Sequence, residues 1–343
     1  MESAIPKYLK QQRTRSRSIK EDFQPPYPAT VARFTKDIKN VVMAYFGVQF
    51  PKEHADVLTP LVLKEMGIKL SKKLGPAHWD IATYEDEESF VNLLFIAYWD
   101  QPSNYEKWYI ANVSNWLNNP FNDSLIGTFL EELTPSVERF ETLYSSVVSD
   151  GVDHMSSERS SPMQEHGYWG SMRDRIPLSQ TDAMDAVGHP QVTEVGLIKK
   201  VLPQQNLCLI RSGQDWTMTC TDQRKMYLEE VEPVLSKGML FLRDEGESVD
   251  CYVNRYMKIL DSNGNLMEQS FGMGWWRSLE ALEKWSKSHP THVAIFGAAM
   301  KYLNKFSSDA KLTLYHEVSV ADKTEQRFEY YNCHSKTGML KLA

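Results

Sequence analysis

Two stretches decide the fold: residues 92–108 are NLLFIAYWDQPSNYEKW, and residues 272–285 are GMGWWRSLEALEKW. Each begins with branched and aromatic residues typical of a buried strand and continues into a helical pattern. Trp99 and Trp108 lie nine residues apart, one at the strand end and one in the helix, and the second stretch repeats that spacing. This spacing predicts an internal repeat, in which the second half of the chain resembles the first.

The flanking residues extend the repeat into two similar halves. In the first half we expect strands and helices at Val41–Phe50, Leu58–Lys73, Asn92–Trp99, Pro102–Leu117 and a closing strand ending at 140–144. In the second we expect them at Asn206–Ser212, Met226–Arg243, Gly272–Trp276, Ser278–Lys287 and Val293–Phe306. The closing strand of each half contains a Thr-Leu-Tyr sequence, within 141–144 and within 312–315.

This order of elements predicts an α+β fold. Each half approximates the strand–helix–strand–strand–helix–strand order of a ferredoxin-like unit, and two such units can place antiparallel sheets face to face with the helices outside. The predicted parts are an N-terminal extension (1–36), a first ferredoxin-like half (37–150), a connecting segment with a pocket-lining loop (151–204) and a second half (205–343).

Composition limits the classes of function. The chain has 343 residues, 42% of them hydrophobic, and a net charge of −7, which does not suit a nucleic-acid-binding body. No apolar run approaches the roughly 18 residues of a membrane span, and the first residues lack the apolar core of a secretion signal. The basic residues of 1–36 are expected to form a strap along this subunit or a neighbour. We therefore predict a cytoplasmic protein without nucleic-acid or membrane partners.

The sequence SHPTH at 288–292 opens a helix with an unusual histidine. Pro290 suits a first helical turn, and His292, Phe296 and Ala299 share one apolar face that small residues keep low. Such a face can hold the iron of a flat macrocycle through His292, although a histidine of the hydrophobic core has the same pattern. The four cysteines show no CxxC or CxxCH spacing, so a haem would be held non-covalently.

Four further residues are candidates for chemistry. Ser212 is expected where a strand gives way to a glycine turn, although turn backbone can also satisfy its hydroxyl. His316 should share a strand face with Leu314 and Val318, where it can act as an acid–base group or as an ordinary sheet histidine. Arg175 can orient a polar group or form a structural ion pair. Glu141 can raise the pKa of a nearby histidine.

Several enzyme classes lack their motifs. The remaining histidines have no zinc-ligand spacing such as HExxH, and the chain has no P-loop, no GxSxG and no GxGxxG that opens a helix. Hydrolase, nucleotide-binding and dehydrogenase functions therefore have little support.

Taken together, several blocks resemble the aldoxime dehydratases, haem-containing lyases that convert aldoximes to nitriles. The matching blocks are MESAI (1–5), FETLY (140–144), EHGYWGSMRDR (165–175), LIRSGQDW (209–216), SHPTH (288–292), LYHEVSV (314–320) and FEYYNCHSKTGML (328–340). They extend over most of the chain, and only the stretch 183–202 lacks a match.

The resemblance implies a role for each candidate residue. It implies a haem b with ferrous iron in the active state, with His292 as the proximal ligand and His316 as the distal acid–base. Arg175, Ser212 and Glu141 would complete the distal site. It also implies a homodimeric α/β-barrel-like fold and a small aldoxime substrate. The alternatives are another haem enzyme of a related fold (a peroxidase or a haem-degrading monooxygenase), a non-catalytic haem sensor, or a haem-free structural dimer.

Overall fold

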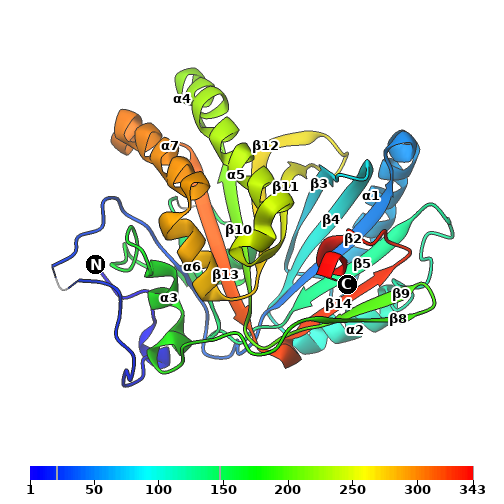
Figure 1. Cartoon of the computed structure of the whole chain (residues 1–343), viewed down its shortest axis with the longest axis horizontal. Helices are drawn as coiled ribbons and strands as arrows, with labels where there is room; N and C mark the ends of the chain where they lie inside the picture. The colour runs from blue at the N-terminus through cyan, green and yellow to red at the C-terminus, as the bar shows by residue number, and fades with distance from the viewer. Residues whose placement is uncertain (21, 147, 343) are drawn as a thin grey trace.

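A computed structural model describes residues 1–20, 22–146 and 148–342 (Figure 1). Glu21, Val147 and Ala343, which fall in the predicted extension and the two halves, lie outside the described residues. The main element is a curled antiparallel sheet of twelve strands, in the order β6-β13-β10-β12-β11-β3-β4-β2-β5-β14-β9-β8. The predicted α+β class with antiparallel strands is confirmed.

The first half of the sheet is built from four strands and two helices. Its strands lie in the order β5-β2-β4-β3. The elements are β2 (Val42–Pro51), α1 (Ala55–Leu70), β3 (His78–Glu85), β4 (Phe90–Trp99), α2 (Pro102–Asn112) and β5 (Gly127–Leu133). Both helices cover one face of these strands, where tryptophans and Phe46 form a dense aromatic core.

The second half has the same strand order, β13-β10-β12-β11. Its elements are β10 (Leu207–Asp215), α4 (Thr221–Met226), α5 (Glu232–Glu245), β11 (Cys251–Leu260), β12 (Leu266–Trp276), α6 (Leu279–Ser288), α7 (Pro290–Phe306) and β13 (Thr313–Ala321). The helix expected at 226–243 is interrupted by a π-helical turn, Tyr227–Val231. Pro233 lies two residues after this turn and has no backbone N–H to donate the hydrogen bond that a regular helix needs there.

The two halves exchange their last strands. β6 (Phe140–Tyr144) follows the first half in sequence but pairs with β13, and β14 (Gln326–Tyr331) follows the second half but pairs with β5. The prediction that 140–144 closes the first half is therefore wrong, because β5 has that place. The exchange brings Glu141 directly opposite Val318, next to the strand that carries His316.

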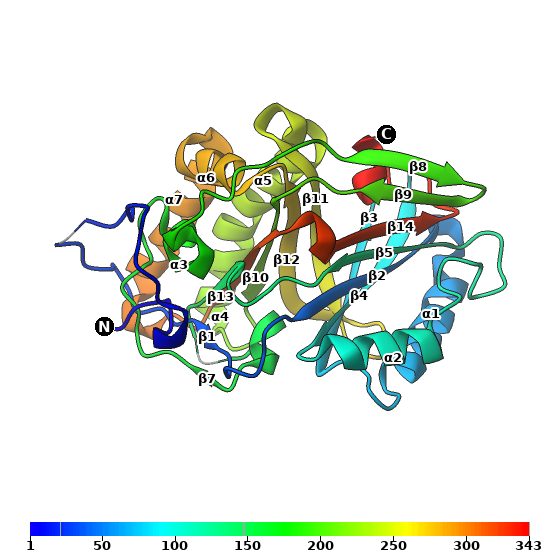
Figure 2. The same ribbon diagram turned by 90° about the horizontal axis from the view of Figure 1, so that it is seen from below.

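A hairpin was missed in the connecting segment. β8 (Gln191–Val195) and β9 (Ile198–Leu202) continue the sheet beyond β14 (Figure 2). Only Val201 of these ten residues is buried. The polar composition of this hairpin, on the outside of the molecule, explains why its residues lack a clear strand signal.

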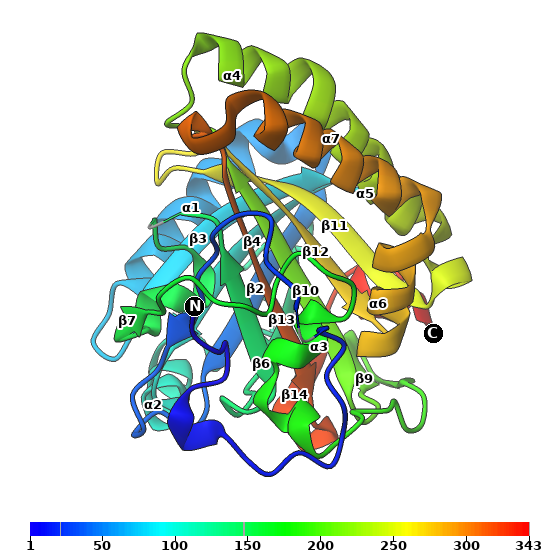
Figure 3. The same cartoon turned by 90° about the vertical axis from the view of Figure 1, so that its left-hand side faces the viewer.

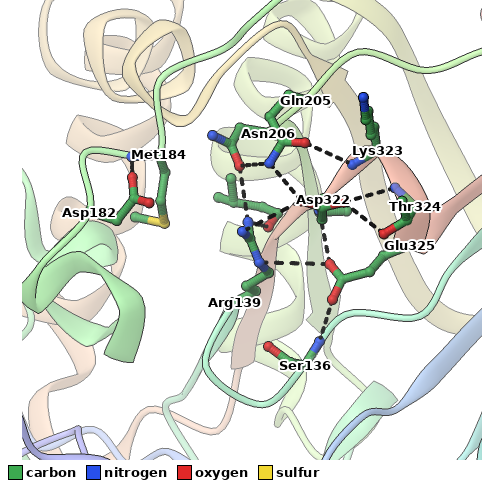
Figure 4. Close-up of polar contacts among 12 residues, drawn as sticks. Ser136, Arg139, Asp182, Met184, Gln205, Asn206, Asp322, Lys323, Thr324 and Glu325 are labelled. Atoms are coloured by element: carbon green, nitrogen blue, oxygen red, sulfur yellow. Dashed lines mark hydrogen bonds and ion pairs between the residues drawn. The ribbon is translucent and has the colours of Figure 1, made fainter.

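The turns at which the chain crosses between the halves are held by one polar cluster (Figure 4). Arg139, just before β6, donates to the side chain of Asn206 at 3.0 Å and lies 3.9 Å from the carboxylates of Asp322 and Glu325. Asp322 and Glu325 also form a capping box on the turn between β13 and β14. The cluster fixes the ends of β6, β10 and β13, the three strands that carry candidate residues.

The N-terminal extension lies along its own chain, as predicted for a strap. Glu2 pairs with Met163, and β1 (Ala32–Arg33) pairs with β7 (Glu158–Arg159). Figure 3 shows the blue extension passing beside α3 (Ser171–Arg175). Within the described ranges, no helix combines the length and the apolar character that a membrane crossing requires.

Candidate active site

Ser212 and His316 lie side by side on the outer face of the sheet. They are directly opposed residues of the antiparallel pair β10–β13, so their side chains leave the sheet on the same side. Their neighbours Arg211 and Glu317 are buried on the other face. The alternation expected around His316 is confirmed. The turn expected after Ser212 is wrong, because β10 continues to Asp215.

Gly213 is explained by this strand pairing rather than by a turn. A Cβ at that position would overlap the ring of Tyr315 on the neighbouring strand. The glycine therefore leaves room for the Tyr315 ring to lie across β10 beside the two candidate residues.

Arg175 joins His316 to Glu141. Its Nε lies 2.6 Å from Oε2 of Glu141, and its Nη2 lies 3.0 Å from Oε1. Nε2 of His316 lies 2.8 Å from Nη2 of Arg175 and 3.0 Å from Oε1 of Glu141. The Arg175 and Glu141 side chains are each 1% exposed. Sequence analysis predicted these three residues for one site, and the structure brings them together.

The charges of this trio determine the state of the carboxylate. Burial tends to raise the pKa of Glu141, but Arg175 and His316 outweigh burial and lower it. Glu141 is therefore a carboxylate at neutral pH. Nε2 of His316 can donate to Glu141 when it carries a proton and accept from Arg175 when it does not. The ring has a partner in either state, as an acid–base group requires.

Arg175 is the last residue of the short helix α3. Gly170, with a left-handed φ of 96°, turns the chain into α3, and Nη1 of Arg175 donates to the carbonyl of Glu165 at 2.8 Å. Arg173 points elsewhere and forms an ion pair with Glu283 of α6 at 2.7 Å. Of the two arginines in MRDR, Arg175 is the one that contacts Glu141 and His316.

His292 occupies the first turn of α7. His289 caps this helix by accepting from the backbone N–H of Thr291. The His292 ring lies between two tryptophans, with centroids 4.7 Å from Trp285 and 6.0 Å from Trp169. Burial lowers the pKa of His292 to about 4, although the carbonyl of Ser286 opposes the shift. The ring is therefore neutral near pH 7, the form that binds a metal.

The surroundings of His292 fit a haem. Its Nδ1 is enclosed and has no hydrogen-bond partner among the described residues. Next to it, Val293 is 48% exposed, Phe296 40% and Trp169 42%, and a Cβ on Gly297 would meet nothing within 4 Å. An uncovered apolar face beside a neutral imidazole is what a flat apolar macrocycle requires.

Helix α7 lies over the strand face that carries Ser212 and His316 (Figures 1 and 3). Ile295 of α7 and Ile210 of β10 pack into the same apolar cluster as Val318 of β13. In the first half, the corresponding space under α2 is filled by Trp108, Trp116 and their aromatic neighbours. The outer face of the second half therefore has apolar surface that no described side chain covers, unlike that of the first half.

One crevice of the molecule lies away from these residues. It has a volume of about 290 Å³ and is lined by residues of β3, β11, α5 and the C-terminal segment, among them Tyr84, Arg255 and Lys341. None of the five predicted site residues lines it, and its acidic and basic side chains do not suit an apolar ligand.

Comparison with known proteins shows the family to which the chain belongs. The family model of haem-containing dehydratases matches residues 44–339. An aliphatic aldoxime dehydratase of Pseudomonas chlororaphis is 41% identical over 100% of this chain and 99% of its own. A phenylacetaldoxime dehydratase of Bacillus sp. (strain OxB-1) is 31% identical over 94% of each chain. A crystal structure of an aldoxime dehydratase in complex with butyraldoxime superimposes with a TM-score of 0.94 at 40% identity, covering 99% of this chain and 96% of that one.

The fold and site thus define an α+β haem enzyme. The chain belongs to the family of haem-containing dehydratases. The resemblance to aldoxime dehydratases and the assignment to the lyases are confirmed, as is haem as the family's cofactor. The roles of the five individual residues remain predictions.

Sequence analysis missed three residues at this site. Trp169 and Trp285 flank His292, and His166 is enclosed beside Arg175. Trp169 and His166 belong to the block EHGYWGSMRDR, where aromatic residues next to arginines were a signal for a pocket-lining loop. Trp285 was noted only as part of the repeat.

Proposed function

We propose that this protein is an aldoxime dehydratase, which removes water from R–CH=N–OH to give a nitrile with ferrous haem b as cofactor. The carrying observation is the contact of His316 with both Arg175 and Glu141, opposite Ser212 on the strand face that α7 covers. The family and the names of the relatives support the same reaction.

In this proposal His292 holds the iron. Its neutral ring and apolar surroundings support that role. When bound, ferrous haem supplies a site for the oxime nitrogen and electron density for cleavage of the N–O bond. Trp169, Phe296 and Val293 supply exposed apolar surface beside His292 on which the macrocycle would lie.

The remaining residues move the protons. Ser212 donates a hydrogen bond to the oxime hydroxyl and orients it. Protonated His316 gives its proton to that hydroxyl, which leaves as water, and neutral His316 then accepts the proton from carbon. The N–O and C–H bonds break, the C≡N bond forms, and the histidine returns to its starting state.

Glu141 and Arg175 favour opposite protonation states of His316. The carboxylate stabilises the protonated ring, and the guanidinium favours the neutral ring and keeps it in place. A balance of the two suits a group that must act first as acid and then as base. A haem sensor needs no such proton relay, so this trio favours the lyase over that alternative.

We also propose the finer features of the assembly. The shared strand order, β5-β2-β4-β3 and β13-β10-β12-β11, supports two ferredoxin-like repeats whose strands lie within 37–150 and 205–343. We propose that the protein forms a barrel-like homodimer, as its resemblance to the aldoxime dehydratases implies. The four free cysteines support a reducing cytoplasmic setting.

An absorption spectrum tests the proposal directly. The purified protein is measured before and after dithionite, then with butyraldoxime or phenylacetaldoxime added without oxygen. We expect a haem band that shifts on reduction and again with aldoxime, together with nitrile formation that stops on oxidation. A haem band unresponsive to either aldoxime would favour a peroxidase or a sensor. No haem band after reconstitution would refute the role of His292.

A further inference from the structure

The N-terminal extension is fastened to the loop before α3 by one buried carboxylate. Glu165 is 2% exposed. It accepts hydrogen bonds from the backbone N–H of Ala4 at 2.8 Å and from the hydroxyl of Ser3 at 3.1 Å, and Arg17 lies 3.6 Å away. Three groups of the extension therefore converge on a single side chain of the loop.

A second buried carboxylate holds the extension farther along. Asp174, also 2% exposed, accepts from the consecutive backbone N–H groups of Ser18 and Ile19 at 2.9 and 3.2 Å. The hydroxyl of Tyr168 donates to the same oxygen at 2.8 Å. A carboxylate with three donors in a buried setting forms strong, directional bonds.

Apolar contacts hold the extension against the loop between Glu165 and Asp174 as well. Tyr27 lies on the ring of His166 with centroids 5.0 Å apart, and Phe23 meets Tyr168 edge-on at 5.0 Å. Pro26 presses against Gly167, where an added Cβ would come within 2.6 Å of the proline ring. The extension thus covers the loop as a fitted layer.

Glu165 and Asp174 are both connected to Arg175 through the backbone. The carbonyl of Glu165 accepts from Nη1 of Arg175 at 2.8 Å, so the residue that binds the extension also binds the guanidinium. Asp174 precedes Arg175 in the same short helix. Because α3 has only five residues, its own hydrogen bonds cannot hold the arginine firmly.

We propose that Glu165 and Asp174 are positioning residues, which use the N-terminal extension to hold Arg175 against Glu141 and His316. The inference rests on the proposed function, since it concerns the proton relay of that reaction. Detaching the extension should let α3 move and lengthen the contacts of the guanidinium, while His292, on a separate helix, keeps its place. A shift of about 1 Å in a positioned group can cost 10²-fold in rate.

The first test compares Asp174→Ala and Glu165→Ala with Asp182→Ala. Asp182 is an exposed carboxylate of the same segment that accepts a hydrogen bond from the backbone N–H of Met184 at 2.7 Å. We expect the two buried variants to lose about 10- to 100-fold in kcat with KM and haem content little changed. Hydrogen exchange at the amides of Ser18 and Ile19 should become faster in Asp174→Ala. The control should match the wild type.

A double-mutant cycle separates positioning from general destabilisation. If Asp174 acts through Arg175, adding Asp174→Ala to Arg175→Lys should lower kcat little further, because the arginine is already gone. The conservative Asp174→Asn, which keeps one acceptor oxygen, should restore part of the rate. Losses in kcat that multiply in full would overturn the proposal.

A further measurement works without turnover. The carbon–oxygen stretch of carbon monoxide bound to the ferrous protein responds to charge on the distal side, so it should shift in Asp174→Ala and stay unchanged in Asp182→Ala. A wild type that binds carbon monoxide but makes no nitrile would refute the proposed function and leave this test valid. An unchanged stretch despite fast exchange at Ser18 would refute the positioning role.

Discussion

The two histidines of the site differ in what surrounds them, and this difference assigns their roles. His292 lies among aromatic and aliphatic side chains, and its Nδ1 has no hydrogen-bond partner in the part of the chain that the structure describes. His316 has a charged partner for each protonation state. A neutral ring among apolar side chains suits a metal, and a ring beside both a cation and an anion suits proton transfer.

This contrast predicts opposite phenotypes for two alanine variants. His316→Ala should keep its haem but lose about 10²–10⁴-fold in turnover, the range for a removed acid–base group. His292→Ala should lose the haem itself. The haem absorbance per protein and the initial rate of nitrile formation check both. Full activity in either purified variant would contradict the assignment.

Ser212 gives a prediction that separates orientation from proton transfer. Ser212→Ala removes one hydroxyl beside His316 and leaves the trio with Arg175 and Glu141 intact. The rate should fall while the pH dependence of turnover keeps its shape, because the acid–base group is unchanged. Glu141→Gln, which removes the negative charge next to His316, should alter the pH profile as well. An unaltered profile in Glu141→Gln would argue against its role.

At the scale of elements, strand β13 shows what local sequence can predict. Its period-two pattern correctly placed His316 on the same face as Leu314 and Val318, because alternation depends only on neighbouring residues. The pairing of β6 with β13 could not be predicted this way, because it joins residues far apart in sequence. Sequence analysis matched 141–144 with 312–315 as the closing strands of the two halves, and the structure contradicts that match. Glu141 and His316 are near each other because the halves exchange strands.

Two substitutions at Gly297 of helix α7 should have opposite effects: one should raise stability and the other should lower haem content. Gly297 lies in the helix interior on the open face, where a Cβ meets nothing. Gly297→Ala should therefore stabilise the haem-free protein by about 0.5–1 kcal/mol through helix propensity. Gly297→Leu, whose side chain would occupy the uncovered face, should lower haem content.

Gly67 of α1 is a matched control for this experiment, since it is also a helical glycine whose Cβ would meet nothing. Gly67→Leu should leave haem content unchanged. Thermal unfolding of the haem-free proteins and the haem absorbance after reconstitution give the two readings. Equal haem binding in both leucine variants would mean that the macrocycle does not lie on α7.

For the molecule as a whole, the repeat predicts two halves of like topology but does not say which one binds the cofactor. That choice depends on side chains. Large aromatic residues such as Trp108 and Trp116 close the outer face of the first half, whereas Gly297 and the partly exposed Phe296 leave that of the second half open. The attachment of the N-terminal extension to the loop could not be predicted from the sequence either. It depends on backbone N–H groups, which every residue has, that donate to Glu165 and Asp174.

The enclosure of His166 by this extension links the stability of the whole molecule to pH. His166 is fully buried, and neither ring nitrogen has a hydrogen-bond partner in the described chain. Burial, and then the charge of Arg175, lower its pKa from 6.5 to about 4. Tyr27 and Arg175 are the ionisable side chains found against it. The folded protein therefore holds this ring neutral where the unfolded chain would protonate it.

The sign of the effect follows from this difference. Above pH 6.5 the ring is neutral in both states, and its contribution to stability is complete. As the pH falls from 6.5 to about 4, the unfolded chain gains a proton that the folded protein does not, so the free energy of unfolding decreases. His166→Phe, an apolar ring of similar shape, should remove this part of the decrease without loss of stability at neutral pH. The exposed His189→Gln should keep the wild-type slope. Urea unfolding at several pH values measures the difference, and parallel curves for wild type and His166→Phe would show that the extension does not enclose a neutral histidine.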